Sequence, residues 1–135
     1  MNDFDLDTIR ISLHILAACV WVGGQVVLAA LVPVLREIAP DAPRKAANRF
    51  GRVAWPFFAV AVLTGVWSLA VVDVGDKSSA YSVTLAVKLV VVAATGTAAA
   101  VHPLTPSPAI RGITGAVGLF GSLAAVVFGV MLVWG

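Results

Sequence analysis

One stretch near the start of the chain, residues 9–35, reads IRISLHILAACVWVGGQVVLAALVPVL. It is apolar over almost its whole length, and a helix of roughly 20 apolar residues is long enough to cross the hydrocarbon core of a bilayer. Three further apolar stretches follow, at residues 53–72, 81–101 and 110–134. These runs are continuous rather than alternating, and a membrane span must satisfy its own backbone hydrogen bonds, so helices are favoured over strands. The sequence therefore predicts four membrane-spanning helices.

The composition places the chain in the membrane class. Hydrophobic residues make up 60% of the 135 residues and charged residues only 12%, whereas a soluble domain has about 25% charged residues. The mean hydropathy is +0.99. The chain starts with the acidic stretch MNDFDLD, which is unlike the basic start of a signal peptide, so we expect the first apolar run to be a retained span. Because the connections are short, we expect an all-α, integral membrane, antiparallel four-helix bundle, with residues 1–135 forming one transmembrane domain.

Lysine and arginine residues are distributed unevenly among the connections. The first connection, residues 36–52, holds five of them, and Arg111 follows the third, whereas the second holds Lys77 beside two aspartates. The positive-inside rule then places the first and third connections in the cytoplasm and both termini outside. We expect a multi-pass protein of a bacterial-type inner membrane. Membrane topology and the attraction of basic residues to anionic lipid headgroups explain these lysine and arginine residues, so no nucleic-acid partner is expected.

Polar side chains inside the predicted spans are few. They are costly in lipid and usually face the protein interior, so each is a candidate functional residue. His14, Thr64 and Lys88 lie at similar depth near the outer ends of three different spans. The sequence predicts an outer-leaflet polar site that contains these three residues and is walled by Trp21 and Trp67.

A second polar group is expected at the other face of the membrane. Arg49 and Arg52 precede the second apolar stretch, and His102 follows the third. We expect these three residues to gather near the cytoplasmic face, where Arg49 and Arg52 would hold acidic groups or lipid phosphate.

Imidazole is a common ligand for transition metals and for haem iron. His14 is therefore the expected metal ligand, with His102 or Met131 as candidates for a second ligand. Lys88 would neutralise a haem propionate or another anion, and Thr64 would supply a hydrogen bond. Copper(I) favours soft sulfur donors, and Cys19 is the only cysteine. The expected cofactor is haem b or copper.

These polar residues also have purely structural explanations. His14 could simply donate a hydrogen bond to a neighbouring helix, and the Lys88 ammonium could extend along its stem to the membrane surface. The fourth apolar stretch is rich in small residues, which let helix backbones approach closely in lipid. This face could pack inside the bundle, form a homodimer or bind a larger membrane complex. Its small residues are Gly118, Ser122, Ala125 and Gly129.

Three segments resemble the copper-resistance D (CopD) family of membrane proteins. They read LHILAACVWVGGQVVLAALVPVLR, RFGRVAWPFFAVAVLTGVWSLA and YSVTLAVKLVVVAATGTAAAVH, and together they cover roughly the first three spans. The resemblance implies an inner-membrane helical protein linked to copper uptake or copper tolerance.

The chain is also similar to the bacterial membrane protoporphyrinogen oxidase family (HemJ). That family has a histidine and a Trp-x-x-Gly element in its first span, an arginine before the second, and a lysine followed by a histidine in the third. The matching positions would be His14, Trp21 with Gly24, Arg49, Lys88 and His102. This resemblance implies haem b binding and oxidation of protoporphyrinogen IX. A third hypothesis is a non-catalytic small subunit of a larger membrane complex.

Overall fold

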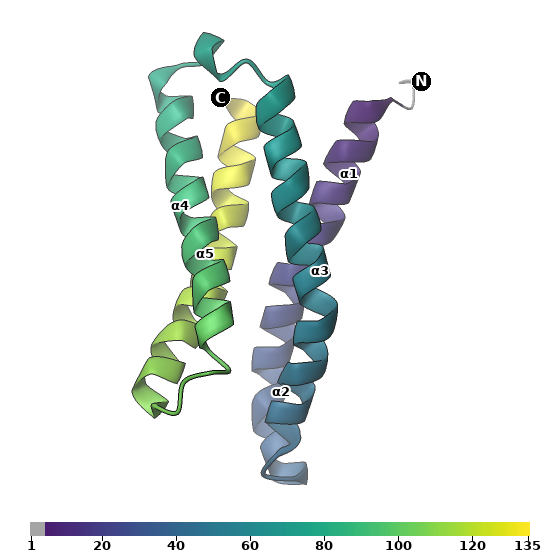
Figure 1. Cartoon of the computed structure of the whole chain (residues 1–135), viewed down its shortest axis with the longest axis vertical. Helices are drawn as coiled ribbons and strands as arrows, with labels where there is room; N and C mark the ends of the chain where they lie inside the picture. The colour runs from purple at the N-terminus through teal and green to yellow at the C-terminus, as the bar shows by residue number, and fades with distance from the viewer. Residues whose placement is uncertain (1–4) are drawn as a thin grey trace. The chain divides into compact units, whose positions relative to one another are not determined.

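A computed structural model describes residues 5–135, and over that range it contains helices and turns but no strand. Four helical stretches are long and apolar enough to cross a membrane, which confirms the all-α prediction with four spans (Figure 1). The first of them is interrupted by a π-helical turn, η1. The elements are α1 (Leu6–Ala18), η1 (Cys19–Gly23), α2 (Gly24–Ile38), α3 (Ala42–Val71), the short 3-10 helix η2 (Val74–Asp76), α4 (Ser79–Val101) and α5 (Pro108–Trp134).

The chain divides into two compact units between Val72 and Asp73. In the first unit, α1, η1 and α2 follow one another along the antiparallel helix α3 (Figure 1). In the second unit, α4 packs along α5. Each unit is thus a helical hairpin. The prediction that residues 1–135 form one domain stays a prediction.

Side-chain caps set the starts of three helices. Asp5 precedes α1 and accepts hydrogen bonds from the backbone nitrogen and the hydroxyl of Thr8, at 2.8 and 2.9 Å. These bonds to the charged carboxylate lower the pKa of Asp5 below its ordinary value. The Asp5 cap therefore stabilises the helix above the ordinary carboxyl pKa and is lost as the pH falls through the lowered one. Ser78 caps α4 and Ser107 caps α5 in the same way.

The first connection is much shorter than residues 36–52, so that prediction is wrong. Only residues 39–41 separate α2 from α3, and most of the predicted basic loop forms the first turns of α3. Asp41 precedes the helix, and Pro43 in its first turn has a backbone angle suited to a helix start. The alanine, arginine and lysine residues that follow are good helix formers. The helix thus begins at Ala42, well before the apolar stretch at residue 53.

Small and polar residues occupy the interior, and large apolar residues face outward. Ala17 and Ala54 are completely buried, and Thr95 and Ser122 are 2% exposed. Large aliphatic and aromatic side chains on all four spans are strongly exposed, such as Leu63 at 68%. Soluble proteins rarely expose apolar surface on this scale, whereas small interior residues are typical of helix packing in lipid. This distribution agrees with a multi-pass protein in a bilayer.

Gly24 on α2 lies directly against the Phe50 ring of α3. A Cβ atom placed on Gly24 would lie 2.2 Å from Cε2 of Phe50, whereas one on Gly23 would meet nothing within 4 Å. We expect Gly24→Ala to lower stability by about 1 kcal/mol, because the half-exposed Phe50 ring can swing partly away. The matched variant Gly23→Ala should be neutral or slightly stabilising. Thermal unfolding of both variants in detergent tests this, and equal melting temperatures would contradict it.

Candidate functional site

His14 lies on α1 with its ring against α3. Its Nδ1 atom is 3.0 Å from the carbonyl oxygen of Ala61 and 2.8 Å from the hydroxyl of Thr64. The Thr64 hydroxyl is itself 2.7 Å from the carbonyl of Val60, to which it donates. Both partners of Nδ1 therefore act as acceptors, and this network assigns the proton of the neutral imidazole to Nδ1. The lone pair then belongs to Nε2, the nitrogen with which a histidine of this tautomer binds a metal.

The Thr64–Gly65 pair forms the seat for this imidazole. Thr64 is 5% exposed, and its hydroxyl provides the acceptor described above. Gly65 follows it, and a Cβ atom there would lie 3.7 Å from Cε1 of His14. The pair thus combines a fixed oxygen with a helix surface that lies against the ring.

Arg10 lies one helical turn before His14 and also contacts α3. Arg10 is 8% exposed. Its two terminal nitrogens donate hydrogen bonds to the hydroxyl of Ser68 and to Asp7, the latter at 3.0 Å. Ser68 donates to the carbonyl of Thr64 at 2.9 Å. The pairs Arg10–Ser68 and His14–Thr64 are therefore successive polar contacts between α1 and α3.

Arg10 was not predicted as a site residue, because a positive charge near the end of a predicted span is also explained as an orientation signal. The signal was present in the spacing. Arg10 and His14 are four residues apart, as are Thr64 and Ser68, and residues at this spacing share a helix face. Polar pairs spaced four residues apart on each of two antiparallel helices predict contacts of the kind observed.

Trp21 lies in η1 and belongs to an aromatic cluster in the first unit. Its ring centroid is 5.3 Å from that of Trp55 and 4.4 Å from that of Phe58, and Trp55 and Phe58 are 5.5 Å apart. Trp67 is 36% exposed, one turn beyond Thr64. Trp55 thus shares ring contacts with Trp21, and the role of Trp21 and Trp67 as walls of a site stays a prediction.

The π-helical turn itself gives Gln25 a structural role. The Gln25 side-chain amide donates to the carbonyl of Trp21 at 3.1 Å, at the junction of η1 and α2. Irregular turns in a span need such substitutes because lipid offers no hydrogen bonds. Single π-helical turns are frequent at functional sites, and this one lies little more than one turn from His14.

His102 has a closely similar environment in the second unit. Its Nδ1 atom is 3.0 Å from the carbonyl of Arg111 and 3.2 Å from the hydroxyl of Thr114. A Cβ atom on Gly115 would lie 3.3 Å from Cε1 of His102. Each histidine thus faces a carbonyl, a threonine three residues later and a glycine directly after it. His102 is therefore a natural control for His14.

Lys88 is half-buried in the second unit, where its Nζ atom would be 3.2 Å from a Cβ atom on Gly129. His14 belongs to the first unit, so a site shared by His14 and Lys88 stays a prediction. The gathering of Arg49 and Arg52 with His102 also joins the two units and stays a prediction. Arg49 and Arg52 are exposed on α3.

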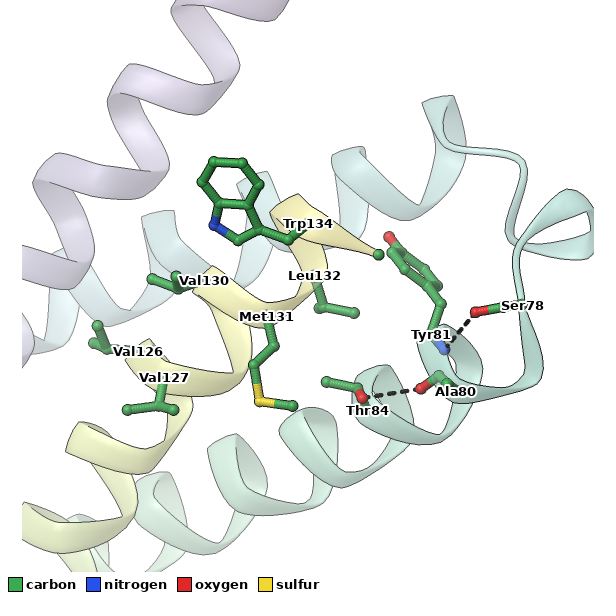
Figure 2. A pocket seen from close by; sticks show the side chains of 11 residues that line it. Ser78, Ala80, Tyr81, Thr84, Val126, Val127, Val130, Met131, Leu132 and Trp134 are labelled. Carbon is green, nitrogen blue, oxygen red and sulfur yellow. Dashed lines mark hydrogen bonds between the residues drawn. The ribbon is translucent and has the colours of Figure 1, made fainter.

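An open groove of about 540 Å³ lies between the start of α4 and the end of α5. Figure 2 shows Tyr81 and Thr84 on α4, and Met131 and Trp134 on α5, among the residues that line it. The remaining lining is mostly aliphatic. The Lys77 ammonium lies 5.3 Å from the centre of the Tyr81 ring. Met131, the candidate second ligand, thus lines an apolar surface that contains no histidine.

Within residues 5–135, no three histidine, cysteine, aspartate or glutamate side chains are grouped to hold a metal ion. A metal bound by one or two of these side chains would need a further ligand, such as a tetrapyrrole. The chain matches no protein-family model, no curated protein and no solved structure.

Proposed function

We propose that this protein is a multi-pass membrane protein that binds haem b through Nε2 of His14. One observation carries the proposal: inside the apolar span, the Nδ1 atom of His14 is held by the carbonyl of Ala61 and the hydroxyl of Thr64, whereas His102 makes the same types of contact at the C-terminal end of α4. Metal-binding histidines almost always donate their other ring nitrogen to such an acceptor, which orients the ring and raises its basicity. His14 meets this requirement inside an apolar span.

The available donors fit haem better than a bare copper ion. A tetrapyrrole supplies four nitrogens to its iron, so a single protein histidine suffices as a ligand. Copper(I) prefers several soft donors, and the only cysteine, Cys19, is exposed on η1. When bound, haem would supply one-electron redox chemistry. Lys88, Trp21 and Trp67 are proposed to complete or support the site, and Arg49 is proposed to hold an acidic group or lipid phosphate at the other face of the membrane.

The proposed orientation follows from charge. With the first and third connections in the cytoplasm, the His14 site lies in the outer half of the bilayer and both termini lie outside. We propose the inner membrane of a bacterial-type cell as its location.

Purification in mild detergent after supplementation with haemin tests the proposal. We expect a Soret band, and elemental analysis of the same sample should find iron equimolar with the chain. If elemental analysis finds copper and no Soret band is present, the copper-handling function implied by the CopD resemblance would replace haem binding as the proposed function. Neither metal, together with a co-purifying complex, would favour the small-subunit hypothesis. Porphyrin fluorescence on addition of protoporphyrinogen IX would extend haem binding to the oxidase activity implied by the HemJ resemblance.

A further inference from the structure

The guanidinium of Arg10 has one nitrogen atom to which the described protein gives no hydrogen-bond partner. Its side chain is 9% exposed, and its Nε atom is buried with no hydrogen-bond partner among the described residues. Such orphaned buried donors are costly and rare in native structures. Each one calls for a partner that the protein alone does not supply.

The contacts of Arg10 leave one side of the guanidinium for such a partner. The two terminal nitrogens are held by Asp7 and Ser68, which fixes the plane of the group. Among residues 5–135, Asp7 is the carboxylate that Arg10 contacts, and its side chain is 64% exposed. A carboxylate pairs with arginine through two parallel N–H bonds, and the edge that includes Nε offers this geometry.

The position of Arg10 connects this donor with the His14 site. The two residues are one turn apart on α1, about 5–6 Å along the helix axis, and both contact α3. Arg10 lies nearer the predicted outer surface. An acidic group of a ligand held at His14 that extends toward the outer surface can therefore reach Arg10.

We propose that Arg10 is the anion-binding half of the His14 site and that its Nε edge binds a carboxylate of the ligand. This inference rests on the proposed function, under which the carboxylate is a haem propionate. The ligand class is then an amphiphilic tetrapyrrole with at least one free carboxylate. Asp7 and Ser68 act as positioning residues that hold the guanidinium in place.

Titration of the full-length protein with haemin and with haemin dimethyl ester tests this assignment. The two pigments carry the same iron and ring, but the ester lacks the carboxylates. We expect the wild-type protein to bind haemin about tenfold more tightly or better, as for a charge-assisted hydrogen bond. Arg10→Gln should remove this preference by weakening the binding of haemin and not that of the dimethyl ester. Arg44→Gln, which removes an exposed arginine on α3, should retain it.

The wild-type comparison keeps the inference falsifiable even where Arg10→Gln fails to fold. Equal affinity of the wild-type protein for the two pigments overturns it while leaving haem binding at His14 intact. A preference that survives in Arg10→Gln also overturns it. If the wild-type protein binds neither pigment, the proposed function fails and this inference fails with it.

Lipid phosphate is the competing source of an anion near the outer surface, and vesicles distinguish it from the ligand carboxylate. Haemin affinity should be the same in phosphatidylcholine vesicles and in vesicles that also contain phosphatidylglycerol. Competition by phosphatidylglycerol in the wild-type protein, absent from Arg10→Gln, would assign Arg10 to lipid phosphate and overturn the carboxylate assignment.

Discussion

His14→Ala is expected to abolish the Soret band of the purified protein, whereas His102→Ala is expected to leave it unchanged. The alanine variant removes the only proposed iron ligand, and nothing in the seat formed by Thr64 and Gly65 can replace an imidazole nitrogen. His102 makes the same types of contact in the other helical hairpin. Its replacement therefore controls for the loss of an imidazole and of its hydrogen bonds.

Absorption spectra and pyridine haemochrome assays on equal amounts of folded protein measure this difference. Thr64→Val should weaken haem binding by about 10–100-fold, as is typical for a partner that orients a ligand. The Ala61 carbonyl remains in this variant and preserves part of the orientation. Thr114→Val is the matching control at His102. A Soret band that survives in His14→Ala would disprove the assignment of the ligand.

The second large effect is expected in the other unit, where Gly121→Ala should destabilise the α4–α5 hairpin by about 1–3 kcal/mol. A Cβ atom on Gly121 would lie 2.4 Å from Cγ2 of Thr95. Thr95 is 2% exposed, its side chain is stiff because it is β-branched, and its hydroxyl donates to the carbonyl of Val92 at 2.9 Å. Rotating the methyl group away would disturb this hydrogen bond in a buried position, so we expect the two backbones to separate instead.

The matched control is Gly112→Ala, because a Cβ atom there would meet nothing within 4 Å. This variant should be neutral or gain the higher helix propensity of alanine. Adding Thr95→Ser to Gly121→Ala removes the clashing methyl group and should restore most of the lost stability. Thermal unfolding in one detergent compares the variants. The proposed close packing is incorrect if Gly121→Ala melts no lower than Gly112→Ala.

Much of the fold could be predicted because length and hydropathy alone determine a membrane span. The pairing of His14 with Thr64 followed from similar depth on adjacent antiparallel helices. The start of α3 was missed because its first turns are basic and polar, so no apolar pattern marked them as helical. Asp41 and Pro43 carried the relevant signal.

The interior contacts were harder to predict. An arginine at position 10 is also explained as a charge that orients the span in the membrane. Only its spacing of four residues from His14 indicates that its side chain faces α3. Trp55 and Trp67 are equally apolar but lie about 18 Å apart along α3, so which of them meets Trp21 depends on the axial register of the first span against α3. Hydropathy does not determine that register. The π-helical turn has no sequence signature, so the contacts beyond it were not predictable.

The π-helical turn η1 separates two halves of the first span, α1 and α2, each of which presents its own residues to α3. An α-helix advances about 100° per residue, and a π-helical turn accommodates one residue more than an α-helical turn. Before it, α1 presents Arg10 and His14 to α3, and after it α2 presents Gly24 to Phe50. The additional residue of the turn therefore lets both halves of the span keep these contacts with α3. A one-residue deletion within Cys19–Gly23 would remove that residue and leave an ordinary α-helical turn, with both halves still in register. A one-residue deletion elsewhere in the span would instead rotate the helix beyond it by about 100°.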